Sequence, residues 1–334
     1  MAILVTGAAG FIGSNFVLDW FSQSNEDIVS LDLLTYAGAF ENLSYLENNS
    51  RHHFIRGNIA DRVLVSKLLK KYHIRAVIHF AAESHVDRAI HKPDFFIETN
   101  IVGTFHLLEC IRDYWSHLNK DLKKDFRFLH VSSDEVYGSL DYDALPFCEN
   151  HRYYPNNPYS ASKAASDHLV WAWYRTYGFP ILITNSSNNF GPRQNMEKFI
   201  PSCILNALNN EPIRIYGDGK HIRDWLYVED HCRAIRLVLE KGDIGSSYNI
   251  GGSNEKTNIE LAITLCKKLD ELKPKKNGKN FKEQINFVKD RSGHDFRYAL
   301  DSSKIKKELG WIPKESFESG ILKTLNWYIE KNRS

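Results

Sequence analysis

The amino-acid sequence predicts an α/β fold, with a doubly wound parallel sheet and a smaller mixed α/β domain. Strand-like and helix-like segments alternate regularly through the first half of the chain. The strand-like segments are continuous apolar runs, such as residues 76–80, which is typical of strands buried on both faces. A glycine-rich turn joins the first strand to the first helix, where sheets of this kind bind ligands.

Short apolar runs predict the strands of this sheet, at residues 2–5, 28–31, 53–55, 76–80, 126–131 and 181–185. Segments with a helical spacing of apolar residues lie between them, at residues 11–21, 61–72, 100–115 and 159–177. The last of these helices ends at Gly178, and Pro180 prevents its continuation. The alternation places helices on both faces of the sheet.

The glycine turn has the pattern G-x-x-G-x-x-G, formed by Gly7, Gly10 and Gly13. The first glycine permits the tight turn, the second lets a pyrophosphate approach the backbone, and the third packs helix on strand. Asp32 ends the next strand, where its carboxylate can accept hydrogen bonds from a ribose diol and would repel a 2′-phosphate. The sequence therefore predicts a Rossmann-like sheet that binds NAD rather than NADP.

The composition of the chain changes after residue 190, where the segments become shorter and richer in loops. We expect an NAD-binding domain over residues 1–190, to which later segments near 220–250 return. Residues 191–334 should mainly form the substrate-binding domain. Within it, Thr257 and Glu260 form a capping-box pattern ahead of a helix that reaches Leu272.

Composition excludes several classes of protein. The 334 residues carry 43 basic and 41 acidic side chains, so no concentrated basic field is present to bind nucleic acid. No apolar run approaches the ~20 residues that cross a bilayer, so we expect no membrane association. The five cysteines are scattered, and the N-terminus has no basic segment before its apolar run. We expect reduced thiols and a cytoplasmic location.

Tyr159 and Lys163 form the pattern Y-x-x-x-K at the start of a predicted helix, where side chains four residues apart share a face. A lysine ammonium beside a tyrosine lowers the pKa of the phenol, which could then act as a general base toward a sugar hydroxyl. A second copy, Tyr216 to Lys220, contains two glycines and should lie on a turn. A buried tyrosine beside an unrelated lysine remains the alternative interpretation of the first copy.

Two adjacent carboxylates, Asp134 and Glu135, follow the apolar strand at 126–131 and a hydroxyl, Ser133. Neighbouring like charges disfavour joint ionisation, so at least one pKa should rise and leave one acid and one base. Elimination of water needs such a pair, whereas simple oxidation does not. The alternative is a polar loop whose carboxylates face solvent.

The chain resembles the extended short-chain dehydrogenase/reductase family over residues 6–295. The resemblance is carried by TGAAGFIGS, LDLLTYAG, HFAAESHVDR, VSSDEVYG, YSASK, IYGDGKHIRDWLYVEDH, YNIGGSNEKTN and DRSGHD. The strings DEVYG and HFAAESHVDR make it most similar to the branch of nucleotide-sugar 4,6-dehydratases that act on dTDP-glucose. The glycine turn and Y-x-x-x-K are shared with epimerases, decarboxylases and reductases.

This resemblance implies a reaction that forms a 4-keto-6-deoxy sugar nucleotide with no net redox change. Tyr159, helped by Lys163 and Ser133, would take the proton of the C4 hydroxyl while a hydride passes from C4 to NAD. Glu135 would remove the C5 proton and Asp134 would protonate the leaving C6 hydroxyl. The hydride then returns to C6, so NAD should stay bound through turnover.

The resemblance also implies binding residues. The expected NAD contacts are Gly7, Gly10, Phe11, Ile12, Gly13, Asp32, Thr35, Asn58, Ile59, Ala81, Ala82, Thr99, Tyr159, Lys163 and Asn189. The expected contacts to the nucleotide sugar are Ser84, Ser133, Asn188, Glu197, Lys198, Tyr216, Arg223, Asn258, Arg291 and His294. The family implies a homodimer, for which the stripe of Ile101, Phe105 and Leu108 could serve, although it could equally pack on the sheet.

Three positions depart from the pattern of the family, which usually has threonine at Ser133, aspartate at Asn58 and proline at Ser292. None of these changes removes a group that the reaction requires. A UDP-glucose 4,6-dehydratase, a 4-epimerase and a non-catalytic NAD-binding protein remain alternatives. For Arg223 the alternative is a structural salt bridge with Asp224. We expect no metal, because His79, His85 and His91 lack ligand spacing.

Overall fold

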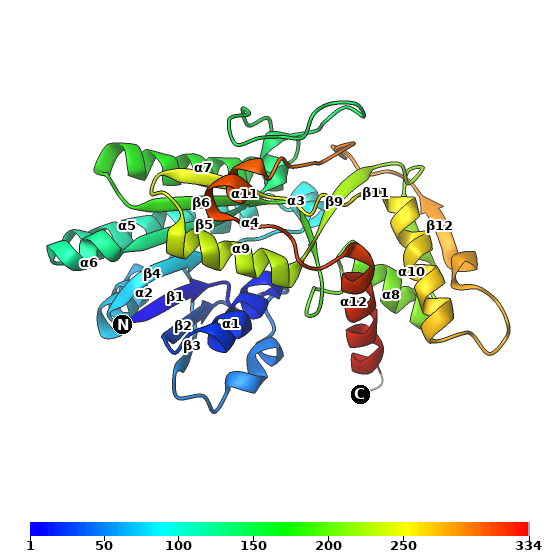
Figure 1. Ribbon diagram of the computed structural model, residues 1–334, viewed down its shortest axis with the longest axis horizontal. Helices are drawn as coiled ribbons and strands as arrows, with labels where there is room; N and C mark the ends of the chain where they lie inside the picture. The colour runs from blue at the N-terminus through cyan, green and yellow to red at the C-terminus, as the bar shows by residue number, and fades with distance from the viewer. Residues whose placement is uncertain (333–334) are drawn as a thin grey trace.

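The computed structural model describes residues 1–332 and confirms the predicted α/β architecture (Figure 1). The main sheet has seven parallel strands in the order β10-β6-β5-β4-β1-β2-β3. Their bounds are β1 Ala2–Thr6, β2 Asp27–Asp32, β3 His52–Arg56, β4 Ile74–His79, β5 Arg127–Ser133, β6 Ile181–Ser186 and β10 Ser246–Ile250. Each apolar run that predicted a strand overlaps one of the strands β1 to β6.

Helices cover both faces of this sheet, as its continuous apolar strands require. Ile3 and Val5 of β1 face a core that α1 and α9 complete, and Ala2 and Leu4 face a core shared with α2 and α5. The bounds of the long covering helices are α1 Phe11–Gln23, α2 Arg62–Lys71, α5 Thr104–Ser116, α7 Pro158–Tyr177 and α9 Val228–Lys241. Almost every position of the central strands β1, β4 and β5 is therefore buried, so a site has to be built at the strand ends.

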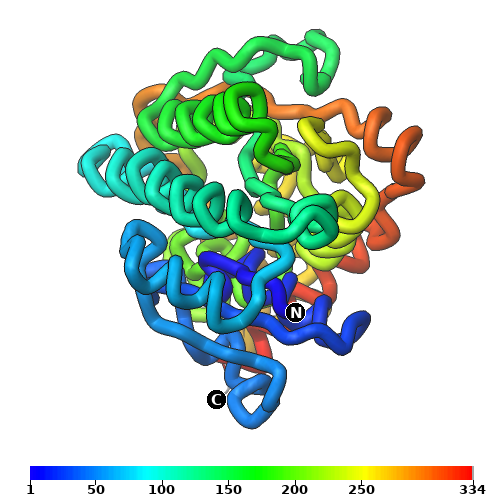
Figure 2. Tube along the Cα trace, turned by 90° about the vertical axis from the view of Figure 1, so that its left-hand side faces the viewer, coloured from blue at the N-terminus to red at the C-terminus, as the bar shows by residue number. Residues whose placement is uncertain are grey.

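The helix predicted over residues 100–115 begins earlier and has two parts. A π-helical segment, η2 (Ile97–Gly103), leads into α5. Leu108 and Ile111 are fully buried on the sheet, whereas Phe105 is 37% exposed and packs edge-on against Trp173 of α7. Figure 2 shows α5 and α7 running side by side. The stripe thus divides between the core and an outer face.

The second half of the chain builds a smaller unit with its own core (Figure 1, right). It contains a three-stranded sheet, β11-β9-β7, and a pair, β12-β8. The bounds are β7 Asn188–Phe190, α8 Phe199–Leu208, β8 Ile213–Tyr216, β9 Ile222–Tyr227, β11 Glu255–Thr257, α10 Asn258–Leu272, β12 Ile285–Val288 and α12 Phe317–Lys331. The capping box of Thr257 and Glu260 is present at the start of α10, as predicted.

Segments from late in the chain also join the first unit. β10 pairs with β6 at the edge of the main sheet, and α9 packs against α1. The remaining short elements are η1 Phe40–Leu46, α3 Val86–His91, α4 Asp94–Phe96, α6 Lys120–Asp125, η3 Asp134–Tyr137, η4 Phe281–Gln284 and α11 Ser303–Leu309. Within residues 1–332, no helix combines the length and the apolar character that a bilayer crossing needs. The boundary at residue 190 stays a prediction.

Candidate active site

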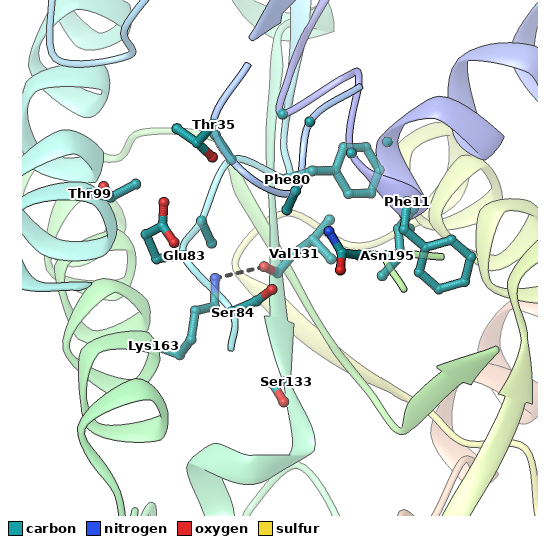
Figure 3. Close-up of a pocket in the computed structure, with 18 of the residues that line it drawn as sticks. Phe11, Thr35, Phe80, Glu83, Ser84, Thr99, Val131, Ser133, Lys163 and Asn195 are labelled. Carbon is teal, nitrogen blue, oxygen red and sulfur yellow. Dashed lines mark hydrogen bonds between the residues drawn. The ribbon is translucent and has the colours of Figure 1, made fainter. Parts of the chain in front are cut away.

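A single cavity lies at the carboxyl ends of the main-sheet strands (Figure 3). Its lining includes the turn after β1, the end of β2, the loop after β4 and the end of β5. The residues predicted to contact the cofactor all lie in this lining: Gly7, Gly10, Phe11, Ile12, Gly13, Asp32, Thr35, Asn58, Ile59, Ala81, Ala82, Thr99, Tyr159, Lys163 and Asn189. Segments far apart in the sequence meet here because parallel strands present their carboxyl ends at one edge.

The glycine turn leaves room for a phosphate at one position only. Gly7 has φ +68°, and a Cβ there would lie 2.6 Å from the backbone nitrogen of Ala81. A Cβ at Gly13 would lie 2.2 Å from the Gly7 carbonyl oxygen, so this glycine serves close packing. Gly10 caps α1, and a Cβ there would meet only the Gly7 oxygen, at 3.3 Å. The free N–H groups of the first turn of α1 thus open onto the cavity beside Gly10.

Asp32 and Asn58 stand where a dinucleotide of this fold would place its ribose and adenine. The buried Asp32 carboxylate accepts the backbone N–H groups of Ala9 at 2.9 Å and of Leu34 at 2.8 Å. Burial raises its pKa. The Asn58 amide oxygen accepts the N–H of Ala60 at 2.9 Å. Each oxygen can accept a further hydrogen bond, so this wall suits NAD.

Buried polar atoms without a partner are a second sign that a polar ligand belongs in the cavity. The side-chain oxygens of Asn188 and Gln194 line it, and neither has a hydrogen-bond partner among the described residues. Leaving a buried acceptor unsatisfied costs about 1–3 kcal/mol. The residues present therefore fit a bound dinucleotide.

Tyr159 and Lys163 lie in the first two turns of α7, which Asn157 caps by accepting the N–H of Ser160. The Lys163 ammonium donates to the carbonyl oxygen of Val131 on β5 at 2.9 Å (Figure 3). Burial lowers the pKa of Lys163 to about 8. The pKa of Tyr159 is raised by burial and by the charge of Glu135.

This result corrects one expectation. Tyr159 was predicted to have a lowered pKa because of Lys163, but in the chain by itself the pKa of Tyr159 is raised. The Lys163 ammonium donates to the main chain of β5, and burial and the charge of Glu135 raise the phenol pKa more than the hydrogen bond from Ser133 lowers it. Tyr159 can therefore act as a base only if the ligands bound in the cavity lower its pKa.

The acid pair begins the short helix η3 directly after β5. Ser133 caps this helix: its hydroxyl accepts the Glu135 N–H at 3.2 Å and donates to the Asp134 carboxylate at 3.2 Å. Burial, then the charge of Glu135, raises the pKa of Asp134 well above its ordinary value. Burial also raises the pKa of Glu135, but the cations Arg291, Lys198 and Arg223 oppose that rise. The surroundings therefore favour the protonated form more strongly at Asp134 than at Glu135.

The predicted substrate contacts divide into two groups. Ser84, Ser133, Asn188 and Lys198 line the cavity, and the Lys198 ammonium donates to the Ser84 carbonyl oxygen at 2.6 Å. The remaining predicted contacts lie outside its lining and form contacts among themselves and with neighbouring loops: Glu197, Tyr216, Arg223, Asn258, Arg291 and His294.

Glu197 immediately precedes Lys198, which lines the cavity, and pairs with Arg88 at 2.6 Å. Tyr216 ends β8, and the turn after it carries the second Y-x-x-x-K copy, as predicted. The Tyr216 ring lies 6.2 Å from that of His294 and 5.9 Å from the Arg291 guanidinium. Asn258 begins α10, and its backbone N–H donates to the His221 carbonyl oxygen.

Arg223 is buried and its guanidinium is already bonded. It donates to the carbonyl oxygens of Ile222 at 2.7 Å and Asp295 at 2.8 Å, and lies 4.4 Å from the ring of Tyr298. Asp224 accepts backbone N–H groups of Gly252 and Asn254 instead of pairing with Arg223. The salt bridge considered as an alternative for Arg223 is therefore absent from the described contacts.

The sequence analysis missed several residues at or behind the cavity. Glu83 and Tyr36 line it, and both carry a raised pKa because of burial. Behind Lys163, the fully buried His130 and Asp167 pair at 3.1 Å. Asp167 lies four residues after Lys163, on the same helical face, which was a signal available in the sequence.

Comparisons with known proteins agree with this geometry. The model of the GDP-mannose 4,6 dehydratase family matches residues 4–324. A dTDP-glucose 4,6-dehydratase of Xanthomonas campestris is 55% identical over 326 residues, covering 98% of this chain and 92% of that protein. The dTDP-glucose 4,6-dehydratase 1 of Escherichia coli K12 is 52% identical, covering 100% of this chain and 94% of its own.

Solved structures give the same result. DesIV, a dTDP-glucose 4,6-dehydratase of Streptomyces venezuelae solved with NAD bound, has a TM-score of 0.90 and 42% identity, covering 100% and 98% of the two chains. A UDP-glucose 4-epimerase of Thermotoga maritima has a TM-score of 0.86 but 28% identity, covering 99% and 100%. The chain therefore belongs to the GDP-mannose 4,6 dehydratase family, within the extended short-chain dehydrogenases/reductases.

Proposed function

We propose that this chain is an NAD-dependent hydro-lyase that converts dTDP-glucose into dTDP-4-keto-6-deoxyglucose and water. The buried pair of Asp134 and Glu135, set between Ser133 and the Tyr159 helix, carries this proposal. Its two carboxyl groups have different electrostatic surroundings, as an elimination that needs one acid and one base requires. The whole-length similarity to dTDP-glucose 4,6-dehydratases supports the same activity.

The first step is the removal of the proton from the C4 hydroxyl. Tyr159 accepts this proton, and Ser133 hydrogen-bonds to the phenol. Lys163, protonated below about pH 8, places a positive charge behind the reacting atoms and is positioned by the Val131 carbonyl. When bound, NAD supplies the acceptor for the C4 hydride and the donor of the same hydride to C6.

The second step is the elimination across C5 and C6. The C4 ketone acidifies the C5 hydrogen, and Glu135, kept anionic by Lys198, Arg223 and Arg291, removes it as a proton. Asp134, kept protonated by burial and by its neighbour, gives its proton to the C6 hydroxyl, which leaves as water. Glu135 then returns its proton to C5 as C6 is reduced. Asp134 is left ionised and Tyr159 keeps the proton of the C4 hydroxyl, so one proton transfer from Tyr159 to Asp134 restores the starting state.

The cations around Glu135 also support a negatively charged substrate. Arg291 and Lys198 lie close enough to Glu135 to lower its pKa, and such cations can pair with the diphosphate of a nucleotide sugar. Thymine and uracil differ by one methyl group, worth about 1–3 kcal/mol in a pocket. The preference for dTDP-glucose over UDP-glucose therefore follows from the similarity to the relatives and not from these charges.

A side-by-side assay tests the proposal. Purified chain without added NAD receives dTDP-glucose or UDP-glucose, and mass spectrometry detects the loss of one water. We expect product from the thymidine substrate, and Glu135→Gln should form none. Product from the uridine substrate alone would assign UDP-glucose as the substrate in place of dTDP-glucose. Epimerised sugar without loss of water, unaffected by Glu135→Gln, would contradict the dehydratase and favour a 4-epimerase.

We infer that the chain acts as a homodimer in the cytoplasm. Phe105 of α5 and Tyr177 of α7, respectively 37% and 46% exposed, form with Trp173 an outer aromatic face that a second copy would cover. The five cysteines are all free thiols, which suits a reducing compartment. Light scattering should give twice the chain mass, and Phe105→Asp should give the monomer mass with the fold retained by circular dichroism. A monomeric wild type would contradict the dimer.

A further inference from the structure

Three side chains that commonly bind metal ions meet outside the NAD cavity. His221 lies just before β9, whereas Asp290 and His294 lie on the loop after β12. Their ligand atoms all lie within 4.8 Å of one another. The Asp290 carboxylate is 2.7 Å from Nδ1 of His294 and 3.4 Å from Nε2 of His221. One nitrogen of each imidazole therefore lies beside the same carboxylate.

The surrounding backbone holds these groups together. The two imidazole rings are stacked, with centroids 3.6 Å apart. The Val288 carbonyl oxygen accepts the Gly217 N–H at 3.0 Å, which ties the loop of Asp290 to the turn that leads to His221. The other nitrogen of His221, Nδ1, is buried and has no hydrogen-bond partner among the described residues. Asp290, whose side chain is 40% exposed, leaves the cluster open to an ion from solvent.

The donor set indicates the class of ion. Two imidazoles and one carboxylate are the ligands of many sites for Zn²⁺ and other late first-row divalent ions, and a set of three leaves a position for water or another ligand. Mg²⁺ and Ca²⁺ prefer oxygen ligands. Arg223 and Arg291 place positive charge near both imidazoles, and Asp218 places negative charge near His221. Asp87 pairs with Arg291 at 3.6 Å, which partly offsets the charge of that cation.

We propose that His221, Asp290 and His294 form a site for one Zn²⁺-class ion, separate from the NAD cavity. The stacked rings must open slightly so that both nitrogens can face the ion. An ion there ties the 290–294 loop to the turn before β9. It also occupies Nδ1 of His294, a predicted substrate contact. Zinc should therefore compete with the nucleotide sugar, an expectation that rests on the proposed function, whereas zinc binding itself does not.

Binding can be measured without activity. Chain stripped of metal by a chelator is titrated with Co²⁺, whose visible absorption reports nitrogen ligation, and Zn²⁺ is counted by equilibrium dialysis. We expect one ion per chain, and at least a tenfold weaker affinity in His221→Asn and in Asp290→Asn. The matched control is His151→Asn, which removes the histidine of a thiol–imidazole pair elsewhere in the chain, with Cys148 Sγ 3.2 Å from its Nδ1.

The variants give separable outcomes. Unchanged melting temperatures in the absence of metal would show that His221→Asn and Asp290→Asn fold. No binding to the wild type, or equal binding by wild type and His221→Asn, would overturn the site. Loss of binding in His151→Asn would assign the ion to the Cys148 pair instead. Zinc that binds the wild type but leaves the KM for dTDP-glucose unchanged would overturn the competition and leave the metal site in place.

Discussion

The cofactor side and the substrate side of the cleft are built in different ways. On the cofactor side, the predicted residues all line one cavity, and most belong to turns that directly follow strands of the main sheet. On the substrate side, only some of the predicted contact residues line the cavity. Arg223, Arg291 and His294 come from the second half of the chain and are held by contacts with one another's loops.

This difference shows what makes a site predictable. A strand end of a parallel sheet has a known position, so a motif attached to it has one too. The position of a loop in the smaller unit depends on tertiary packing, which no local sequence pattern predicts. The acid pair lies at the meeting point, because it is carried by β5 but its electrostatics depend on the loops.

Replacing Glu135 should break the substrate side and leave the cofactor side intact. We expect Glu135→Gln to lower kcat by about 10²- to 10⁴-fold, because it removes a general base. Exchange of the C5 hydrogen with solvent deuterium should disappear, while NAD remains bound. Glu149→Gln, at a partly buried carboxyl group that accepts the Asn249 N–H at 2.8 Å outside the cavity, is the matched control. Normal turnover by Glu135→Gln would refute its role.

Replacing Asp32 tests the cofactor side. A hydrogen bond to a charged group contributes about 1.5–3 kcal/mol, so Asp32→Asn should weaken NAD about 10- to 100-fold. The lost negative charge should also reduce discrimination against NADP. Isothermal titration of cofactor-stripped chain with both dinucleotides measures this. Asp27→Asn, at the other end of the same strand, should change neither affinity. Unaltered NAD affinity in Asp32→Asn would remove Asp32 from the ribose site.

The pH dependence of activity tests the buried groups that lie behind the site, Lys163 and Asp167. Lys163, with a pKa of about 8, is charged below that pH and neutral above it, so activity should fall on the alkaline side of about pH 8. The buried negative charge of Asp167 raises this pKa against the larger effect of burial. Asp167→Asn should therefore move the alkaline limb about one unit lower, and reduce activity at pH 8 by up to about tenfold.

A paired variant distinguishes charge from structure at this position. The Ser132 hydroxyl donates to Asp167 at 2.7 Å, and Ser132→Ala removes that contact while it keeps the carboxylate. It should shift the alkaline limb of kcat less than Asp167→Asn. Equal shifts in the two variants, or an alkaline limb that stays in place in Asp167→Asn, would show that Asp167 acts only in packing.

The smallest effect is expected at Ser133, on the border between the two sides. Ser133→Thr adds a methyl group that restricts the rotamer of the hydroxyl. Because the hydroxyl contacts both Asp134 and Tyr159, kcat should change by about two- to tenfold. Steady-state kinetics with dTDP-glucose provide the measurement. A larger loss would mean that the cavity has no space for the extra methyl group.

Much of the fold could be predicted, and the reason is visible in particular elements. The strands β1, β2, β4, β5 and β6 are short and almost wholly buried, so their apolar runs were unambiguous. The capping box at Thr257 and the glycine stop at Gly178 are local signals, and both are present. The π-helical start at Ile97 had no comparable signal, and the loops that place Arg291 and His294 depend on the pairing of β12 with β8.

The electrostatics of the catalytic groups could be predicted only in part. Adjacent carboxylates at Asp134 and Glu135 repel wherever they stand, so a raised pKa followed from the sequence. The effect of Lys163 on Tyr159 did not, because a lysine four residues away on a helix can bond elsewhere. In this chain its ammonium bonds to the Val131 carbonyl oxygen.

The sequence by itself determined the sheet, the glycine turn, a carboxylate at the end of β2 and the presence of a tyrosine, a lysine and an acid pair, because each depends on spacing along the chain. The tertiary structure alone decided which charges surround each carboxyl group of that pair, what holds Lys163, and that His221, Asp290 and His294 meet. Those properties depend on burial and on charges brought together from distant segments, and burial and distance exist only once the chain is folded.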